Sequence, residues 1–382
     1  MLCIVGITAP MPRLDINMRI LSFSFIGVLL LATPAYADIN IAAVGPITGQ
    51  DATTGEQMQW GAQAAVEAIN AAGGVLGQKL HLTIKDDACD PKQAVAIANE
   101  LSGEGIFAVI GNMCSGSAIP ASKVYNEENI LAISPSATSP LLTDQGFDNI
   151  FRTCGRDDQQ GAVVADLISK KYPGKNIAIV QDKTAYGQGL ADEVKKDLHK
   201  LGIQEKLYES ISRGERDYSS LISKLKENRI DVVFYGGYYT EAGLIVRQMR
   251  DQGMQTVLIG DDDLTTKDFW SITGAAGEGT LMSFNTDART KPEAADAVKR
   301  IRASGFDPEG ITLYSYAAVQ AVAEAITRAG EAKAPKVIAA LHQGSYPTVL
   351  GDIAFDKKGD VTKPDYIIYR WGKGVYAPLE GQ

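Results

Sequence analysis

The segment IFAVIGNMCSGSAIPASKVYNEEN, residues 106–129, contains the pattern that decides the fold. It begins with an apolar run of strand length, turns at a glycine followed by small polar residues, and continues as a segment compatible with a helix. The turn brings Cys114, Ser115 and Ser117 to the start of that helix, where backbone N–H groups are free. A nucleophilic serine, a phosphate-binding loop and a carboxylate-binding corner all fit this pattern, so the rest of the chain must choose among them.

Apolar runs and helical patterns alternate along the chain from Asp38 onward. Strands that alternate with helices of about 10–15 residues predict parallel sheets covered by helices on both faces. Each half of the chain carries several such units, with a break near residues 152–160, so we predict an α/β protein with two doubly wound lobes. The runs expected to form strands are 39–45, 79–87, 106–112, 130–137, 176–182, 205–211, 231–237 and 256–262.

Residues 1–37 have the pattern of a secretory signal peptide. Met18 and Arg19 open a basic start, an apolar stretch follows, and residues 35–37 form an A-x-A cleavage site before Asp38. The 17 residues before Met18 fit no targeting pattern, which makes Met18 a candidate start. The residue directly after the cleavage site is Asp38 and not a cysteine, which argues against a lipid anchor. We therefore predict an exported, soluble mature chain that begins at Asp38.

The predicted mature chain is acidic and long enough for two lobes. Because residues 1–37 include Arg13, Arg19 and Asp15, the 37 basic and 46 acidic residues of the full chain become 35 and 45, a net charge of −10. This charge disfavours binding to nucleic acid or to an anionic membrane surface. A length of about 345 residues exceeds what one hydrophobic core usually supports.

Three cysteines follow the predicted cleavage site: Cys89, Cys114 and Cys154. An oxidising compartment favours pairing of two of them. Cys89 and Cys114 each follow an apolar run, so both lie beyond the ends of strands expected to be neighbours, and a bridge there would contribute ~3–4 kcal/mol in the chain-entropy model. Cys154 is then expected to be a free, buried thiol. With no CxxC pair and no nearby histidine, we predict no metal site.

The sequence gives little support to an enzyme. A nucleophile elbow has the form G-x-S-x-G, whereas the turn G-N-M-C-S misplaces the serine. The three histidines, His81, His199 and His342, have no neighbours that suggest a catalytic triad or a metal site. The run YGQG at residues 186–189 is followed by Asp192 where a dinucleotide fingerprint needs glycine. We predict no catalytic residues and no cofactor.

Unusual residues follow the apolar runs, which is where doubly wound sheets bind their ligands. The first half offers small hydroxyl groups, at Ser115 and in the loop SPSATSP, residues 134–140. The second half offers tyrosines and acids, in FYGGYY at 234–239 and in the run 261–263, where a single acid facing the cleft would suit an ammonium group. An N-cap serine, a polar loop and aromatic packing are the simpler interpretations. Together these residues are typical of a cleft that takes an anion on one face and a cation with an apolar body on the other.

At these segments the chain resembles the periplasmic leucine/isoleucine/valine-binding proteins of bacterial ABC importers. The similarity runs in order from Asp38 to about Trp371, and the segments that carry it are DDACDPKQAVAIAN, GNMCSGSAIPAS, SPSATSP, DKTAYGQGLA, YGGYY and LYSYAAVQA. The resemblance implies the type I periplasmic-binding-protein fold, with two α/β lobes joined by a three-strand hinge and closing over one amino acid. It implies lobe boundaries as follows: lobe 1 is 38–156 plus 285–363, and lobe 2 is 157–284 plus 364–382.

The resemblance also implies a disulfide and a ligand clamp. Cys89 and Cys114 match the pair that is bridged in the family, in agreement with their expected positions. The serine after the second cysteine would bind the ligand carboxylate, two second-lobe tyrosines would close over the ligand, and Asp262 would bind the ammonium where the family usually has glutamate. In the loop SPSATSP, Ser136 and Thr138 would also bind the ligand carboxylate through backbone and hydroxyl groups, and Thr138 would lie near the ammonium group as well. The predicted ligand-binding residues are Ser115, Ser136, Ala137, Thr138, Tyr186, Tyr238, Asp262 and Thr54.

Two positions depart from the family pattern. Thr54 replaces a bulky aromatic residue, and Ile311 is aliphatic where an aromatic residue is often found, so we expect a roomier or more polar side-chain pocket. Trp60 is expected either to compensate or simply to pack. These observations predict a monomeric periplasmic solute-binding protein that takes a free L-amino acid, branched-chain or otherwise hydrophobic, to an inner-membrane ABC permease. The alternatives are a sensor of the same fold, a binder of a small amide or other small polar metabolite, and a secreted enzyme acting on small amides.

Overall fold

Five parallel strands form the first sheet; the apolar runs predict four of them, and the fifth, Ile150–Arg152, was not predicted. The computed structural model describes residues 1–12 and 38–381, so the predicted cleavage site and Met18 lie outside the described residues. Residues 1–12 contain no helix or strand. The sheet has the order β2-β1-β3-β4-β5. Its strands are β1 (Ile39–Gly45), β2 (Leu80–Asp86), β3 (Ala108–Gly111), β4 (Leu131–Ser134) and β5 (Ile150–Arg152).

The second sheet has seven strands in the order β14-β13-β10-β9-β8-β6-β7. Strands β10, β9, β8, β6 and β7 pair in parallel. Strands β13 and β14 join them antiparallel at one edge, which the apolar runs did not predict. The strands are β6 (Ile177–Gln181), β7 (Leu207–Ser210), β8 (Val232–Gly236), β9 (Val257–Gly260), β10 (Leu281–Asn285), β13 (Tyr366–Gly372) and β14 (Val375–Pro378). A separate hairpin consists of β11 (Ser345–Thr348) and β12 (Gly351–Ala354).

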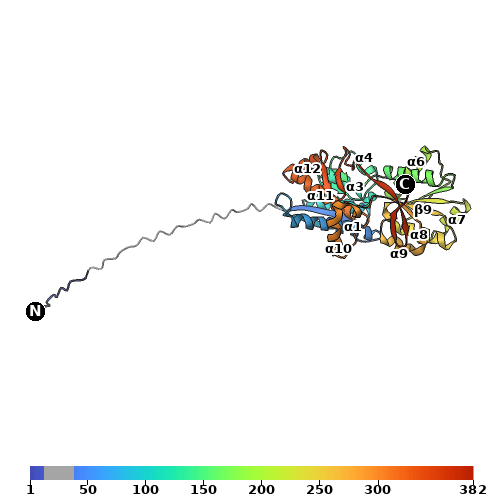
Figure 1. The fold of residues 1–382 in the computed structure, drawn as a ribbon. Helices are drawn as coiled ribbons and strands as arrows, with labels where there is room; N and C mark the ends of the chain where they lie inside the picture. Colours follow the sequence, from blue (N-terminus) through green and yellow to red (C-terminus); the bar gives the residue numbers. More distant parts are fainter. Residues whose placement is uncertain (13–37, 382) are drawn as a thin grey trace. The chain divides into compact units, whose positions relative to one another are not determined.

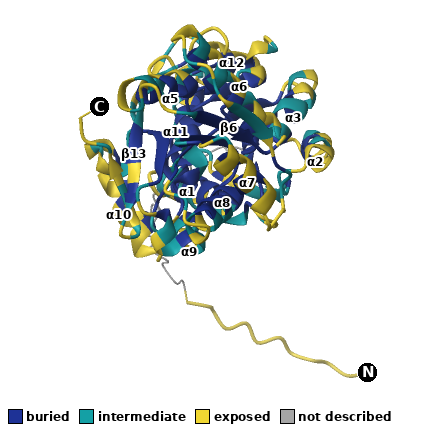
Figure 2. Ribbon diagram, turned by 90° about the vertical axis from the view of Figure 1, so that its right-hand side faces the viewer, coloured by how far each residue is buried: buried dark blue, intermediate teal, exposed yellow. Residues whose placement is uncertain are grey.

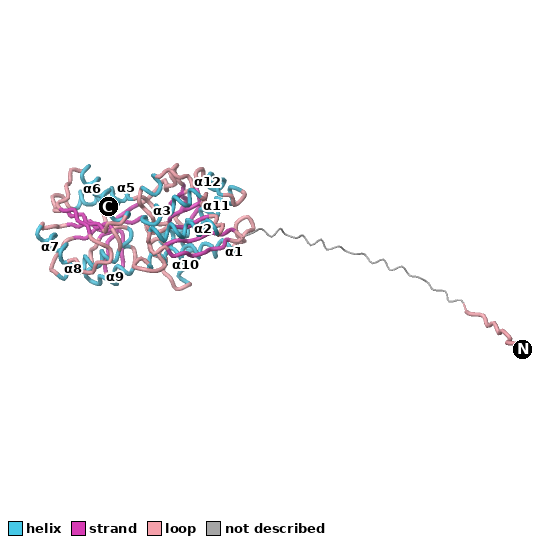
Figure 3. The backbone as a smooth tube through the Cα atoms, turned by 180° about the vertical axis from the view of Figure 1, so that it is seen from behind, coloured by secondary structure: helices cyan, strands magenta, loops and turns pink. Residues whose placement is uncertain are grey.

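Helices cover both sheets, and Figures 1 and 3 show them in two groups, with α1, α3, α10, α11 and α12 beside the first sheet and α6, α7, α8 and α9 beside the second. We call the two groups, each with its sheet, lobe 1 and lobe 2. The helices are α1 (Ala52–Ala71), α2 (Pro91–Gly103), α3 (Ser115–Glu127), α4 (Leu141–Asp144), α5 (Asp157–Lys171), α6 (Ala185–Lys200), α7 (Ser219–Glu227), α8 (Tyr239–Asp251), α9 (Lys267–Thr273), α10 (Ala295–Ala303), α11 (Thr312–Ala329) and α12 (Ala334–Leu341). Short 3-10 turns are η1 (Asp262–Leu264), η2 (Gly274–Gly277), η3 (Ala288–Thr290) and η4 (Pro292–Ala294).

The central strands are buried on both faces. Every residue of β3, β4, β6 and β8 is buried, which explains why these strands appear in the sequence as continuous apolar runs instead of alternating ones. Figure 2 shows β6 and α11 in the buried class, while α2 and α10 carry exposed residues on their outer sides. Among the described residues, none of the helices combines the length and the apolar character needed to cross a membrane.

The helix α1 packs closely against α11 and begins earlier than its apolar periodicity indicates. A Cβ atom on Gly61 would lie 2.0 Å from the carbonyl oxygen of Thr312, so glycine is required for this close approach. The periodic stretch starts at Gly61, but the helix starts at Ala52. The early start places Thr54 on the first turn of a helix, at the edge where the strands end.

The chain passes between the two sheets three times, after β5, after β10 and before β13. The first and third passages run side by side, since the Arg152 N–H donates to the Gly359 carbonyl at 3.0 Å. Gly359 has a φ of +94°, and a Cβ there would lie 2.0 Å from the Ile150 carbonyl oxygen. These passages form the three-strand hinge of the predicted fold. The exact lobe boundaries at residues 156, 285 and 363 stay a prediction.

Candidate ligand-binding site

The strand ends of the two lobes surround one cavity, which contains about 380 Å³ of empty space including its open mouth. Six of the eight predicted ligand-binding residues line it: Thr54, Ser115, Ser136, Tyr186, Tyr238 and Asp262. Ile311, which was singled out as a departure from the family pattern, also lines it. Ala137 and Thr138 are fully buried and are not among the lining residues.

A helix begins at one corner of the cavity. Helix α3 starts at Ser115, as the sequence predicts, but its N-cap is Cys114 and not a serine. The predicted disulfide is confirmed, because Cys114 is bonded to Cys89 with a Cα–Cα distance of 5.5 Å. The Ser115 Oγ accepts the Ser139 N–H at 3.3 Å, which leaves its own hydrogen free to donate. Since the first N–H groups of a helix have no partner within it, this corner is suited to an anion.

The loop after β4 is held from behind by an arginine. The Arg152 side chain is fully buried; its Nη1 donates to the Ala137 carbonyl at 2.6 Å and its Nη2 donates to the Ser139 carbonyl at 3.0 Å. The Ala137 N–H donates to the Ser134 Oγ at 2.9 Å. Both polar backbone groups of Ala137 therefore have partners inside the protein, and Ser136 is the loop residue that reaches the cavity.

Thr138 lies next to an unusual buried acid. Its hydroxyl faces the Asp157 carboxyl group at the start of α5, yet neither makes a hydrogen bond of normal geometry within the described chain. Burial raises the pKa of Asp157 to about 8, and the negative charge of Asp262 acts in the same direction while Arg152 opposes it. This acid was not predicted to matter, because nothing in the local sequence distinguishes it from an ordinary first-turn aspartate.

Asp262 lies opposite, on lobe 2, and its carboxylate is oriented by two donors. The Tyr186 hydroxyl donates to Oδ1 at 2.6 Å and the Gln160 amide donates to the same oxygen at 3.1 Å. Gln160 is itself fixed, because it also donates to the Ser283 hydroxyl at 2.9 Å. Both donors use Oδ1, so Oδ2 can accept from a ligand. Burial raises the pKa of Asp262, and the hydrogen bonds from Tyr186 and Gln160 oppose this rise.

The three consecutive acids have different roles. Asp261 is fully buried and accepts the Gly237 N–H at 2.9 Å and the Asp263 N–H at 3.2 Å, so it fixes the local backbone. Asp262 and Asp263 both line the cavity, whereas the sequence suggested a single acid facing the cleft. Asp263 also accepts the Tyr239 N–H at 2.8 Å.

Two tyrosines and two small side chains complete the wall. The rings of Tyr186 and Tyr238 are inclined by 60°, with their centroids 5.5 Å apart. Thr54 and Ile311 both face the cavity. Trp60 does not compensate for Thr54: its ring stacks on Phe306 with centroids 5.5 Å apart, and it is not a lining residue.

One group of residues has metal-ligand chemistry at first sight. Ligand atoms of Asp51, Cys89 and Cys114 lie within 4.8 Å of one another. Both sulfur atoms belong to the disulfide, so neither is a thiolate that could bind a metal. Cys154 is free and buried, as expected, and burial raises the pKa of its thiol.

The sequence model of the family described as "Periplasmic binding protein" matches residues 38–375. The chain belongs to the periplasmic binding protein family. Membership implies a periplasmic location and a solute-binding role.

Relatives of this periplasmic binding protein include proteins named for branched-chain amino acids. "Leu/Ile/Val-binding protein homolog 1" of Brucella melitensis is 49% identical over 357 residues, which cover 92% of this chain and 96% of the relative. An "Amino acid binding protein" of Pseudomonas aeruginosa is 45% identical over 364 residues, covering 94% and 97%. Both names describe proteins that bind amino acids.

Solved structures support the same fold. The leucine-binding protein LivK of Thermotoga maritima matches with a TM-score of 0.83 and 25% identity, covering 89% of this chain and 97% of its own. LivJ of Streptococcus pneumoniae in complex with isoleucine matches with a TM-score of 0.82 and 25% identity, covering 90% and 99%. The family resemblance and the fold predicted from the sequence are therefore confirmed.

Four lining residues of this binding protein were not predicted: Met113, Cys114, Asp263 and Thr265. Cys114 and Asp263 are next to predicted ligand-binding residues in the chain, Met113 lies two residues after the end of β3, and Thr265 follows η1. Position after a strand was thus a usable signal for the first three. No comparable feature of the sequence indicated the side-chain contacts that Arg152 and Gln160 make around the cavity.

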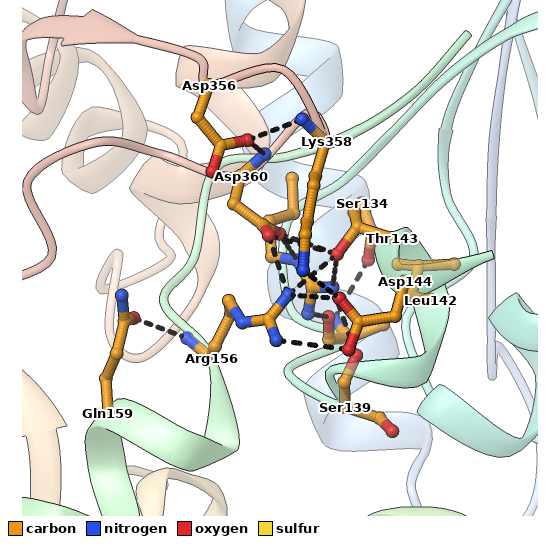
Figure 4. Close-up of polar contacts among 12 residues, drawn as sticks. Ser134, Ser139, Leu142, Thr143, Asp144, Arg156, Gln159, Asp356, Lys358 and Asp360 are labelled. Atoms are coloured by element: carbon orange, nitrogen blue, oxygen red, sulfur yellow. Dashed lines mark hydrogen bonds and ion pairs between the residues drawn. The ribbon is translucent and has the colours of Figure 1, made fainter. Parts of the chain in front are cut away.

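A polar network supports the hinge behind the site (Figure 4). Arg156 lies between two carboxylates, 3.2 Å from Asp144 and 2.7 Å from Asp360, and Lys358 contacts Asp144 at 2.6 Å. The Nε atom of Arg152 is 2.6 Å from the Asp360 carboxylate, which also accepts the Thr143 hydroxyl at 2.9 Å. The network therefore connects the first and third hinge passages to the loop that borders the cavity.

Proposed function

We propose that the cavity binds a free L-amino acid, held by its carboxylate on lobe 1 and by its ammonium group on lobe 2. One observation carries this proposal: a single cavity joins the N-terminus of α3, with Ser115, to the carboxylate of Asp262. A free α-amino acid carries both charges, a carboxylate and an ammonium group, on the same carbon atom. The names of the relatives support the same class of ligand.

The carboxylate of the ligand is placed at the α3 corner. There the Ser115 hydroxyl and the first N–H groups of the helix donate, and the helix dipole adds a favourable field. Ser136 borders the same corner. The unpartnered, buried hydroxyl of Thr138 supports its proposed part in the clamp after a small movement of the loop, while Ala137 contributes by shaping that loop.

The ammonium group is placed at Asp262 Oδ2, with the Tyr238 ring beside it. Tyr186 has two roles: its hydroxyl donates to Asp262 Oδ1, and its side chain lines the cavity. Since the two charged ends of the ligand contact different lobes, the ligand binds the closed form more tightly than the open form. This difference in affinity favours closure and marks the loaded protein.

The side chain of the ligand is placed against Thr54, Ile311 and Met113. Two of these residues are apolar, and together they suit a branched-chain or other hydrophobic side chain, while the short Thr54 leaves room at that end. We propose that the protein is exported by residues 1–37, works as a monomer without a membrane anchor, and delivers its ligand unchanged to an inner-membrane ABC permease.

The clamp is tested by titrating three related compounds: leucine, leucinamide and 4-methylpentanoate. Leucinamide lacks the carboxylate and 4-methylpentanoate lacks the ammonium group, so both should bind at least about 30-fold more weakly than leucine, as expected when a buried charge loses its partner. In Asp262→Asn, the preference for leucine over 4-methylpentanoate should shrink. Asp251→Asn, a change at an exposed position at the end of α8 on lobe 2, serves as the control. Equal affinity for all three compounds would contradict the proposal.

A further inference from the structure

A two-point ion pair connects the lobes beside the cavity. Asp51, immediately before α1 on lobe 1, accepts from Arg213 on lobe 2 through both carboxylate oxygens, at 2.7 Å and 2.9 Å. The Asp51 side chain is 4% exposed and the Arg213 side chain is 20% exposed. A pair with this geometry and burial is stronger than a typical surface ion pair.

Arg213 also contacts the wall of the cavity. Its guanidinium carbon lies 3.9 Å from the ring centroid of Tyr238, a lining residue and the N-cap of α8. A planar guanidinium at this distance interacts favourably with the ring face. One side chain therefore connects an anchor on lobe 1 with a ring that borders the ligand site on lobe 2.

Several acids surround this single cation. Besides Asp51, three acids interact electrostatically with the Arg213 guanidinium: Asp182, Glu241 and Asp263. The loop that carries Arg213 is fixed at its base, because the Gly214 N–H donates to the Glu241 carboxylate at 2.9 Å. Removal of the arginine would leave buried acids without their counter-charge, so its position is strongly determined.

Other bonds between the lobes differ from this pair. The Tyr239 hydroxyl donates to the Gln50 carbonyl at 3.0 Å, and the Thr53 hydroxyl donates to Asp268 at 2.6 Å. Neither of these bonds includes a residue that lines the cavity. Of these cross-lobe contacts, the Asp51–Arg213 pair alone touches the binding site through Tyr238.

We propose that Arg213 is a positioning residue that clasps Asp51 when the lobes close and holds the Tyr238 ring against the ligand, so that it slows ligand release. This inference rests on the proposed binding of an amino acid in the cavity. The pair exists only while the lobes are together, and a ligand that is enclosed between them leaves only after they part. Breaking a partly buried charge pair is therefore part of the barrier to release and not of the barrier to entry.

Stopped-flow tryptophan fluorescence with leucine tests the kinetic part. Arg213→Ala and Asp51→Asn should each raise the dissociation rate constant about 10- to 100-fold and change the association rate constant by less than about 3-fold. Arg213→Lys keeps the charge but loses the two-point geometry, so its dissociation rate constant should lie between those of Arg213→Ala and the wild type. The double variant should release leucine no faster than the single variants, because both remove the same contact.

Arg328→Ala is the matched control. Arg328 also pairs with a carboxylate, Glu324 at 2.8 Å, and also lies over a tyrosine ring, Tyr346 at 4.5 Å, but all three residues belong to lobe 1 and none lines the cavity. Its loss should leave both rate constants within about 2-fold of wild type. An unchanged dissociation rate in Arg213→Ala, or a double variant whose effect equals the product of the single effects, would overturn the inference.

Closure itself is measured by a distance between spin labels on Lys123→Cys in lobe 1 and Lys226→Cys in lobe 2, two exposed positions. Without ligand, Arg213→Ala should shift the distance distribution toward longer values than in the otherwise wild-type protein. Identical distributions would refute the clasp even if no amino acid binds. A failure of the wild type to bind leucine or any other amino acid would instead refute the proposed function, so the two failures are distinguishable.

Discussion

At the scale of single residues, Ser115 combines a hydroxyl group with the first turn of α3. Ser115→Ala should weaken amino-acid binding by about 1–3 kcal/mol, because one charge-assisted hydrogen bond is lost from a buried site. Ser122→Ala is the control on the same helix, since the Ser122 hydroxyl donates to the Ile119 carbonyl and does not line the cavity. Calorimetric titration measures both variants. An unchanged dissociation constant for Ser115→Ala would remove this residue from the clamp.

Asp157 predicts a pH dependence of stability. Burial raises its pKa to about 8, whereas an aspartate in an unfolded chain titrates near about 3.9. Between these values the folded protein holds a proton that the unfolded chain has lost. The stability contributed by this group is therefore fully present below about pH 4 and is lost as the pH rises through about 8.

Asp157→Asn should remove that decline. The difference in free energy of unfolding between the variant and the wild type should grow by roughly 2–4 kcal/mol in favour of the variant when the pH is raised from 5 to 9. Urea denaturation at both pH values measures the gain. Asp166→Asn, an exposed change on the same helix, is the control and should show a similar difference from wild type at both pH values. If Asp157→Asn behaves like the control, the carboxyl group is ionised in the folded protein across this range.

At the scale of elements, Arg152 links β5, the loop after β4 and the third hinge passage. Its loss would take two hydrogen bonds from that loop and one counter-charge from the buried Asp360. Arg152→Ala should lower the free energy of unfolding by about 3 kcal/mol, near the lower limit for a broken buried pair because Arg156 still contacts Asp360. It should also weaken ligand binding, since the loop loses its support.

Lys358→Ala is the control for this hinge change. Lys358 is 54% exposed and contacts Asp144 at the surface, so its loss should cost less than about 1 kcal/mol. Denaturant unfolding and calorimetric titration measure both quantities. If Arg152→Ala were no less stable than Lys358→Ala, the hinge network would not hold the loop.

Much of the fold and part of the site could be predicted at this scale. The buried strands and the start of α3 at Ser115 follow from local patterns, and strand ends indicate where ligand residues lie. Strands β13 and β14 were missed because their burial is only partial and their pairing is antiparallel, and β5 and β10 were also not among the predicted runs. The contacts of Arg152 with Asp360 depend on two hinge passages that are distant in the chain, so no local pattern could indicate them.

At the scale of the whole molecule, the candidate site lies where the two lobes meet. Ser115 and Thr54 belong to lobe 1, and Asp262 and Tyr238 belong to lobe 2, so neither lobe contains a complete clamp. The Asp51–Arg213 pair likewise depends on how the lobes come together. Such contacts could not be predicted from periodicity. The resemblance to a known family supplied the clamp residues, but it did not supply the contacts between lobes.

Calorimetric titration of the refolded, ligand-free mature chain against the twenty amino acids and several small amides tests the proposed clamp most directly. We expect micromolar or tighter binding of some L-amino acids, with the hydrophobic ones preferred and their ranking set by the pocket at Thr54 and Ile311. Binding of an amide or another anion, with no binding of any amino acid, would contradict the proposed ligand class while leaving the fold unaffected.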